Sequence, residues 1–383
     1  MAASYPATDM AVKAAMLVLG FMTGTSLDAV DMAVLDTDGE KIFAFGPAGE
    51  RKLTDAVRDV LLEATRQARE WPRGAPEPPI FHHAAQMVAE EHFAAAEAFL
   101  QAHGLSWPDF DLIGMHGQTV LHERPDGDLP GRTVQLGDAE ALARLCGRPV
   151  AFDFRSADVA AGGQGAPLAP IYHQLRAREA GLAPPLAVLN VGGVANLTLW
   201  TGPGELLAFD TGPGNGMIDL LMQARRAGRY DVDGKYASVG RVDDTVLRTL
   251  LAHPFFDAPP PKSLDRHDFG LEPLDVLQIE DAAATLVAFT AEAVRLGLER
   301  SPVKPSQVIV TGGGRRNPQI MAALAECAAA PVVAAEEVGW RGDAIEAEAI
   351  ALLAARSLRG LPISFPATTG VAQPMTGGRI IRP

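Results

Sequence analysis

Residues 22–31 read Met22-Thr23-Gly24-Thr25-Ser26-Leu27-Asp28-Ala29-Val30-Asp31, a glycine turn between two apolar runs. The run before it, 17–22, has the composition of a buried strand, and the run after it, 30–35, alternates in part, so the stretch predicts a β-hairpin tip. Such a turn offers backbone N–H groups and hydroxyls to phosphate oxygens, and its carboxylate can hold a water of Mg²⁺. The alternative is an ordinary polar hairpin turn, and no Gly-x-x-x-x-Gly-Lys-Ser/Thr loop occurs in the chain.

A second copy of this device lies in the other half of the chain. A buried strand at 186–190 leads into the turn Val191-Gly192-Gly193-Val194-Ala195-Asn196, and strand character resumes at 197–200. A third strand, 206–209, then ends in the loop Asp210-Thr211-Gly212-Pro213-Gly214-Asn215-Gly216. The first half has a comparable strand at 112–113 that ends in the polar loop Gly114-Met115-His116-Gly117-Gln118-Thr119. Each half therefore reads as hairpin, later strand and polar loop, a repeat of elements rather than of residues.

The remaining periodicity favours an α/β fold. Alanine-rich stretches at 80–103, 280–298 and 343–356 are predicted to be helices, and 308–310 is a short β-branched strand. Ligands in α/β folds gather at the carboxyl ends of strands. The loop Thr311-Gly312-Gly313-Gly314 after the last of these strands lacks side chains at three positions, so its backbone can pack against adenine; a plain tight turn is the alternative.

Composition restricts the class of protein. With 383 residues, 48% hydrophobic and 21% charged, the chain is long enough for two or three globular domains. The formal net charge of −14 argues against a nucleic-acid or anionic-lipid partner. The two cysteines, Cys146 and Cys327, lie among small or apolar residues, which predicts buried thiols in a reducing compartment. No apolar stretch is long enough to span a membrane and the apolar run at 14–22 lacks signal-peptide flanks, so a cytoplasmic protein is expected.

Asp210 is the strongest catalytic candidate. It follows an apolar strand and begins a glycine loop, where a carboxylate can act as a general base. Its alternative role is to cap the loop by accepting backbone hydrogen bonds. Two further segments, Asp153-Phe154-Arg155-Ser156-Ala157-Asp158 and Gly162-Gly163-Gln164-Gly165-Ala166-Pro167, supply a cation, two anions and an amide that suit a polyhydroxylated or carboxylated ligand.

Taken together, these motifs resemble those of the 1,6-anhydro-N-acetylmuramic acid kinases, within the sugar kinase, actin and heat-shock ATPase superfamily. The matching pieces run in family order over nearly the whole chain, and they are 22–28, 116–119, 153–155 with Asp158, 162–168, 190–193, 209–215, 311–314 and Glu346.

The resemblance implies an α/β fold of two ribonuclease-H-like domains, as in the actin-like ATPases, flanking an interdomain cleft. We place the N-terminal domain at 1–183 and the C-terminal domain at 184–383, with the last helix free to return to the first domain. The implied activity is ATP-dependent: water opens the 1,6-anhydro bridge while O6 receives the γ-phosphoryl group, which gives N-acetylmuramate 6-phosphate in peptidoglycan recycling.

The resemblance also implies the site residues. Asp210 matches the family's base and Glu346 an acidic residue near the sugar. ATP is expected at Gly24, Thr25, Ser26, Leu27, Asp28, Asp31, Gly192, Gly193, Asn196, Gly212, Gly214, Asn215, Gly312, Gly313 and Gly314. The sugar is expected at His116, Gln118, Thr119, Asp153, Arg155, Asp158 and Gln164. No protein-held metal is expected, because ATP would carry Mg²⁺, with Asp28 nearby.

The sequence departs from the family pattern at several positions. Thr23 and Ala29 replace a serine and a glycine of the first turn, and both changes should spare phosphate binding. The segment 262–267, Lys-Ser-Leu-Asp-Arg-His, is more altered, so contacts from the side chains of Leu264 or Asp265 are in question. The first dozen residues precede the family's usual start and are expected to form a disordered tail.

Two other functions are compatible with the same loops: a kinase for another sugar, and an actin-like or chaperone-like ATPase. The second requires a partner-binding domain or filament surface, and no extra domain separates the motifs. The expected partner is a small amino sugar, without nucleic acid or membrane. A homodimer is compatible with this interpretation.

Overall fold

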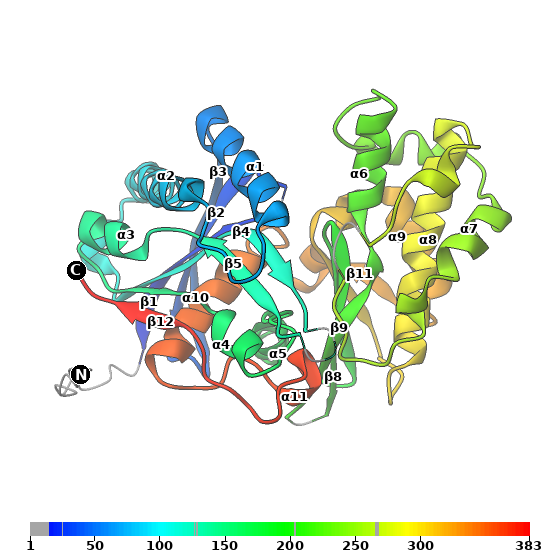
Figure 1. The fold of residues 1–383 in the computed structure, drawn as a ribbon. Coiled ribbons are helices and arrows are strands. Elements are labelled where there is room, and N and C mark those ends of the chain that lie inside the picture. The colour runs from blue at the N-terminus through cyan, green and yellow to red at the C-terminus, as the bar shows by residue number, and fades with distance from the viewer. Residues whose placement is uncertain (1–14, 25, 126, 128, 203, 265–267) are drawn as a thin grey trace.

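The chain forms two β-sheets, each covered by helices, which occupy the two halves of the molecule (Figure 1). The computed structural model describes residues 15–24, 26–125, 127, 129–202, 204–264 and 268–383. The expected N-terminal tail and position 25 lie outside the described residues.

The first sheet has seven strands in the order β12-β6-β4-β1-β2-β3, with β5 paired to β4. Strands β1, β2 and β3 are mutually antiparallel, and β4 and β6 continue the sheet parallel to β1. The strand bounds are β1 Met16–Thr23, β2 Ala29–Thr37, β3 Ile42–Lys52, β4 Leu112–Glu123, β5 Arg132–Leu136, β6 Val150–Phe152 and β12 Arg379–Ile381.

The second sheet repeats this order with five strands, β11-β10-β7-β8-β9. Here β7, β8 and β9 form the antiparallel meander, and β10 and β11 follow parallel to β7. The bounds are β7 Leu186–Val191, β8 Val194–Gly202, β9 Glu205–Pro213, β10 Val308–Thr311 and β11 Val332–Ala334. Two sheets with the same order and directions confirm the repeat of elements that the motifs predict, and they establish the duplicated ribonuclease-H-like fold that the resemblance implies.

Alternation along β1 explains why the first sheet is covered on both faces. Leu19 and Phe21 are fully buried against α2 and α3, whereas Val18 faces the core around α10. The helices of this half are α1 Asp55–Glu70, α2 Pro79–His103, α3 Ala139–Cys146, α4 Ser156–Ala160 and α5 Pro170–Glu179.

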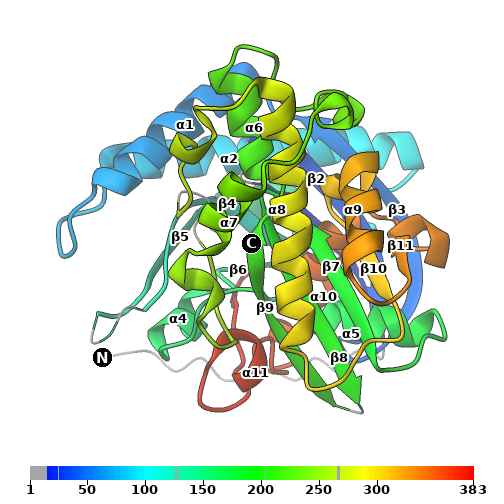
Figure 2. The same ribbon diagram turned by 90° about the vertical axis from the view of Figure 1, so that its right-hand side faces the viewer.

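The second sheet is built in the same way. Leu189 and Phe209 pack against the outer helices, of which α8 lies in front of the sheet in Figure 2. Its other face contributes Val188 and Ile309 to the buried cluster that also contains α5 and α10. The remaining helices are α6 Asn215–Ala224, α7 Asp244–Leu251, α8 Ile279–Glu299, α9 Pro318–Cys327, α10 Ile345–Leu358 and α11 Pro366–Thr369. The two sheets therefore share one core through α5 and α10.

Helix α10 is fixed both by close packing and by ionic hydrogen bonds. It contacts β1, β2 and β4 of the first sheet, so a helix from the end of the chain packs on a sheet from its beginning. Glu348, 1% exposed, accepts a 2.7 Å hydrogen bond from Nε of Arg341 and another from the hydroxyl of Tyr172. Because a buried carboxylate is costly unless it is paired, these partners fix the first turns of α10.

Several element boundaries differ from the sequence predictions. The segment 114–119 is not a loop but part of β4, because β5 pairs with it through Gln118 and Thr119 and Gly117 absorbs the irregularity at φ 73°. Asp210 does not end its strand, since β8 stays paired with β9 as far as Pro213.

The two thiols and the helices bear on the predictions about disulfides and membrane spans. Both cysteines are free, and Cys146 is buried while Cys327 is only partly so, which corrects the second of the two predictions. Among the described residues, the helices are too short or too polar to cross a membrane.

Candidate active site

Asp210 is held in a buried position on β9. The residue is only 8% exposed, and its side-chain Oδ2 accepts a 2.7 Å hydrogen bond from the backbone N–H of Leu264. Burial raises the pKa of Asp210 to about 7, although the Leu264 N–H and the cations Arg124, Lys262 and Arg155 oppose the rise. A carboxylate with a pKa near neutrality is well matched to general-base chemistry.

Arg155 connects several of the predicted sugar-site residues. Its Nε and Nη2 donate to Nε2 of His116 over 3.1 and 2.9 Å, and its Nη1 donates to the carbonyl of Gly165 over 2.7 Å. Burial lowers the pKa of Arg155, and the carboxylates of Glu346, Asp158 and Asp210 act on it in the opposite direction. The structure thus gathers one guanidinium and three predicted carboxylates.

His116 is a neutral acceptor in this arrangement. Its Nδ1 lies 2.7 Å from the carbonyl of Gly117, which can only accept, so Nδ1 carries the proton and Nε2 is free to accept from Arg155. Burial and the charge of Arg155 lower the pKa of His116 to about 3. His116 therefore orients Arg155 rather than exchanging protons near neutral pH.

Glu346 lies on the first turn of α10, and its side chain remains exposed. The protein around it still limits its hydration, which raises its pKa, while Arg155 and a hydrogen bond from Asn190 oppose the rise. Asn190, at the end of β7, was part of a recognised motif but was not predicted as a site residue. It pairs across the sheet with Asn196, which in turn pairs with Asp210, so one row of strand positions links Glu346 to Asp210.

Asp158 has an internal role. It is 2% exposed, its Oδ1 accepts from the N–H of Gly165 over 2.7 Å, and its Oδ2 accepts from the hydroxyl of Thr369 over 2.5 Å. Oδ1 thus holds the 162–165 loop directly, and Oδ2 holds Thr369, whose carbonyl accepts a 2.6 Å hydrogen bond from the N–H of Gln164 in that loop. The same loop carries Gln164, whose Oε1 accepts a 2.7 Å hydrogen bond from the hydroxyl of Ser263.

The three glycine loops of the C-terminal half pack directly on one another. Backbone N–H groups of Gly214 and Gly216 donate to the carbonyl of Gly193 over 3.0 and 3.1 Å, and that of Asn215 donates to Gly192 over 2.7 Å. A side chain at Gly312 would place its Cβ 2.4 Å from Oδ1 of Asn190. Gly314 packs directly against Val191. Seven of the residues predicted to bind the nucleotide therefore lie in one group of packed loops: Gly192, Gly193, Gly214, Asn215, Gly312, Gly313 and Gly314.

Gly212 precedes this assembly on β9. An added Cβ there would lie 2.8 Å from the Cβ of Ala293, so this glycine permits close packing against α8. Gly212 therefore contributes to the packing of the core, and not to the contacts among the glycine loops.

The first hairpin turn is compact. The N–H of Leu27 donates to the carbonyl of Gly24 over 3.2 Å, and Leu27 adopts a φ of 55° with its side chain in the core, so it can offer a ligand only its backbone. Ser26 is exposed. The predicted contact from Thr25 lies outside the described residues.

Asp28 and Asp31, the two acidic residues of this hairpin, both have charged side chains of the protein as neighbours. Asp28 forms an ion pair with Arg229 of the C-terminal half. Burial and the nearby charges of Glu346, Glu50 and Asp343 raise the pKa of Asp31 to about 7. The charge of Glu346 thus acts on Asp31, which connects this residue of the hairpin to the predicted sugar site.

The other predicted sugar residues lie on the β4–β5 side. Gln118 is 1% exposed and donates to the carbonyl of Thr119 over 3.2 Å, and the hydroxyl of Thr119 accepts from Gln135 over 3.4 Å. Asp153, at φ 55°, lies 3.9 Å from Nη1 of Arg379. Asp153, Arg379 and Gln135 line a polar hollow of about 220 Å³ together with His116. Arg379 was missed because it lies on a strand predicted by no motif.

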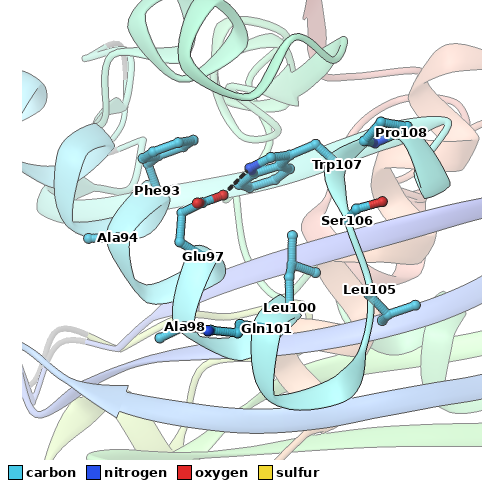
Figure 3. A pocket seen from close by; sticks show the side chains of 10 residues that line it. All are labelled: Phe93, Ala94, Glu97, Ala98, Leu100, Gln101, Leu105, Ser106, Trp107 and Pro108. Carbon is cyan, nitrogen blue, oxygen red and sulfur yellow. Dashed lines mark hydrogen bonds between the residues drawn. The ribbon is translucent and has the colours of Figure 1, made fainter.

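A larger hollow lies elsewhere and contains none of the predicted residues. It has a volume of about 870 Å³ and is lined by the end of α2 and the short helix η1, Trp107–Asp109 (Figure 3). Its Trp107 indole stacks on Phe93 with centroids 5.5 Å apart and donates to Glu97. Volume alone does not identify the active site of this protein.

The chain is similar over its length to one family of enzymes. Residues 16–383 match the family described as anhydro-N-acetylmuramic acid kinase. A protein of that name from Phenylobacterium zucineum (strain HLK1) is 74% identical over 368 residues, which cover 96% of this chain and 100% of the relative. The protein of the same name from Caulobacter vibrioides is 69% identical over 96% of this chain and 99% of its own length. The one from Rhizobium rhizogenes is 49% identical over 94% and 98%.

Solved structures give more distant likenesses. An activator of 2-hydroxyisocaproyl-CoA dehydratase from Clostridium difficile with bound ADPNP is 14% identical with a TM-score of 0.42, over 90% of this chain and 96% of that one. A ROK family glucokinase from Streptomyces griseus in complex with glucose and AMPPNP is 12% identical with a TM-score of 0.42, over 88% and 99%. The fold assignment therefore rests on the two strand orders.

Proposed function

The chain belongs to the anhydro-N-acetylmuramic acid kinase family, and on that basis we propose that it is an ATP-dependent kinase of 1,6-anhydro-N-acetylmuramic acid. The product is N-acetylmuramate 6-phosphate, and the reaction serves peptidoglycan recycling. The observation that carries the proposal is the gathering of Asp210, Glu346 and Arg155 beside the glycine loops of a duplicated ribonuclease-H-like fold, in a chain whose relatives share its full length.

In this mechanism Asp210 takes a proton from the water that attacks the anomeric carbon. The C1–O6 bond then breaks, and O6 attacks the γ-phosphorus of ATP, so the group that leaves the ring becomes the nucleophile. Alignment of both steps in one site contributes the proximity that such coupled reactions need. Glu346 is assigned to hold the water or the sugar, and His116 holds Arg155 toward the reacting groups.

We assign the nucleotide to the paired turns. The phosphates would lie between the turns at 24–28 and 192–193, and the adenosine would lie on 312–314. ATP would bring Mg²⁺ with its phosphates, and Asp28 is the carboxylate of the first turn that would hold a water of the ion. Such an ion would offset the phosphate charge. Asp28, with a side chain 55% exposed, would have to exchange its Arg229 partner for that water.

The same proposal covers the organisation of the protein. We assign 1–183 and 184–383 to the two domains, with α10 and β12 added to the first from the end of the chain, which is supported by their pairing and packing on the first sheet. We propose that the protein acts in the cytoplasm, as a homodimer, without nucleic-acid or membrane partners. The net charge of −14 is consistent with the last point.

Product analysis tests the activity. With ATP, Mg²⁺ and the anhydro sugar, we expect ADP and a sugar heavier by one phosphoryl group and one water, and in H₂¹⁸O the label should enter at C1. N-acetylmuramic acid, N-acetylglucosamine and a sample without sugar are the controls. ADP release that does not depend on sugar would indicate an ATPase, and preference for another sugar would indicate a different kinase; either result contradicts the proposal.

The pH dependence tests the role of Asp210. Because only the ionised carboxylate can accept a proton and its pKa is raised to about 7, kcat/KM should fall about tenfold per unit as the pH drops below about 7. Asp31 titrates in the same range near Glu346, so the profile of Asp31→Asn serves as the control. If kcat/KM of Asp31→Asn still falls below about pH 7, this acidic limb of the profile belongs to Asp210. If the fall is absent in Asp31→Asn, the titrating group is Asp31.

A further inference from the structure

The segment Lys262-Ser263-Leu264 forms two hydrogen bonds with Asp210. The N–H of Asp210 donates to the carbonyl of Lys262 over 2.9 Å, and the N–H of Leu264 donates to Oδ2 of Asp210 over 2.7 Å. Both bonds use the backbone of the segment, so the altered side chain at 264 does not affect them. Asp265, the other altered position, lies outside the described residues.

The charge of Lys262 has another partner. Its Nζ donates to the carbonyl of Phe255 over 2.7 Å and lies 4.1 Å from the centre of the Phe255 ring. The orientation of the Asp210 carboxylate is therefore set by the Leu264 N–H rather than by an ion pair with Lys262.

Ser263, between these two residues, is held by the first half of the chain. Its hydroxyl donates to Oε1 of Gln164 over 2.7 Å, and its carbonyl accepts from the guanidinium of Arg124. Arg124 follows β4 of the first sheet, and its Nη1 also lies 3.5 Å from Asp268. Ser263 is 5% exposed, so these are interior contacts between the two halves of the chain.

Gln164 is in turn rigidly placed. Its N–H donates to the carbonyl of Thr369 over 2.6 Å, and the hydroxyl of Thr369 donates to Asp158, which also holds Gly165. The 162–165 loop is thus connected through Ser263 to the neighbouring N–H that holds Asp210.

We propose that Ser263, Gln164 and Arg124 form a junction that aligns the Asp210 carboxylate only when the two domains are in contact. This inference rests on the proposed role of Asp210 as the base, and it makes Ser263 a positioning residue. When the domains separate, Ser263 loses both partners and the Leu264 N–H is no longer fixed. The base is then misaligned, so water is not activated in an open site, where a misplacement of about 1 Å can cost about 100-fold in rate.

The test compares Ser263→Ala with Ser263→Thr. The alanine variant loses only the hydroxyl bond to Gln164, and we expect kcat to fall roughly 10- to 100-fold while KM for ATP changes less than about twofold. The acidic limb of kcat/KM should move to higher pH, because the Leu264 N–H stabilises the carboxylate form. Ser263→Thr, which keeps the hydroxyl, should restore most of the rate. Ser238→Ala, which removes an exposed hydroxyl bonded to the carbonyl of Lys235, is the control and should change nothing.

A double-variant cycle shows whether the junction acts as a unit. Ser263→Ala combined with Gln164→Met should be no slower than the slower single variant. Additive losses, an unshifted limb or an unchanged kcat in Ser263→Ala would overturn the inference. If Ser263→Ala does not fold, Arg124→Gln disrupts the same junction from a side chain 45% exposed and should give the same loss of kcat. Turnover of the unmodified protein on the anhydro sugar is measured first, so failure of the proposed function is seen separately.

Discussion

Asp210→Asn should lower kcat by about 10²- to 10⁴-fold, the usual contribution of a positioned general base. The amide oxygen of asparagine can still accept from the Leu264 N–H over the same short distance, so the local geometry should survive. The substitution also removes a carboxylate that burial makes costly to ionise, so the thermal stability should be equal or higher at neutral pH. The measurement is steady-state turnover with the anhydro sugar together with ATP binding by calorimetry.

ATP affinity separates a catalytic role from a general defect. The glycine loops that we assign to ATP remain intact in Asp210→Asn, so the Kd for ATP should stay within about threefold of the original. A variant that turns over at more than a third of the original rate would remove Asp210 as the base. Loss of ATP binding together with turnover would instead assign Asp210 to the loop, where a carboxylate can cap backbone N–H groups.

The sequence predicted the fold well where local patterns carry the information. The two hairpins at 22–31 and 191–196 were recognisable because a glycine turn separates apolar runs, and the common strand order follows from that duplication. Strand β12 was not foreseen, since three residues near the end of the chain carry no periodicity and gain their structure only by pairing with β6. The continuation of β4 through 114–119 depends on β5, a partner that lies further along the chain.

The candidate site shows a similar division. Asp210 and Arg155 were predicted from their motifs and Glu346 from the family resemblance, and the structure places the three within electrostatic range of one another. Their hydrogen-bond partners were harder to find: Asn190 bonds to Glu346, and the backbone of Leu264 bonds to Asp210. Such contacts join residues that lie far apart in the chain, and a backbone donor leaves no trace in residue identity.

Gly20→Ala should cause a large loss of stability. Gly20 lies on β1 under helix α10, and an added Cβ would lie 2.1 Å from the carbonyl oxygen of Ala347 and 2.7 Å from the nitrogen of Ala351. These are backbone atoms of a helix that also packs on β2 and β4, so they cannot move aside singly. Overpacking of this kind costs about 1–3 kcal/mol, and we expect the upper end, with a fall in Tm of roughly 4 °C by calorimetry for a chain of 383 residues.

A series of glycines in one sheet tests whether the distance to α10 determines the cost. Gly114→Ala on β4 would place its Cβ 2.9 Å from the carbonyl of Ile350 and should be intermediate. Gly49→Ala on β3 meets only the ring of Phe99 at 3.5 Å, an ordinary contact, and should leave Tm nearly unchanged. Equal effects at the three positions would mean that lost backbone freedom, not the approach of α10, decides stability. Because Glu346 immediately precedes Ala347, the displacement in Gly20→Ala should also lower kcat at temperatures where the variant is still folded, whereas Gly49→Ala should keep it.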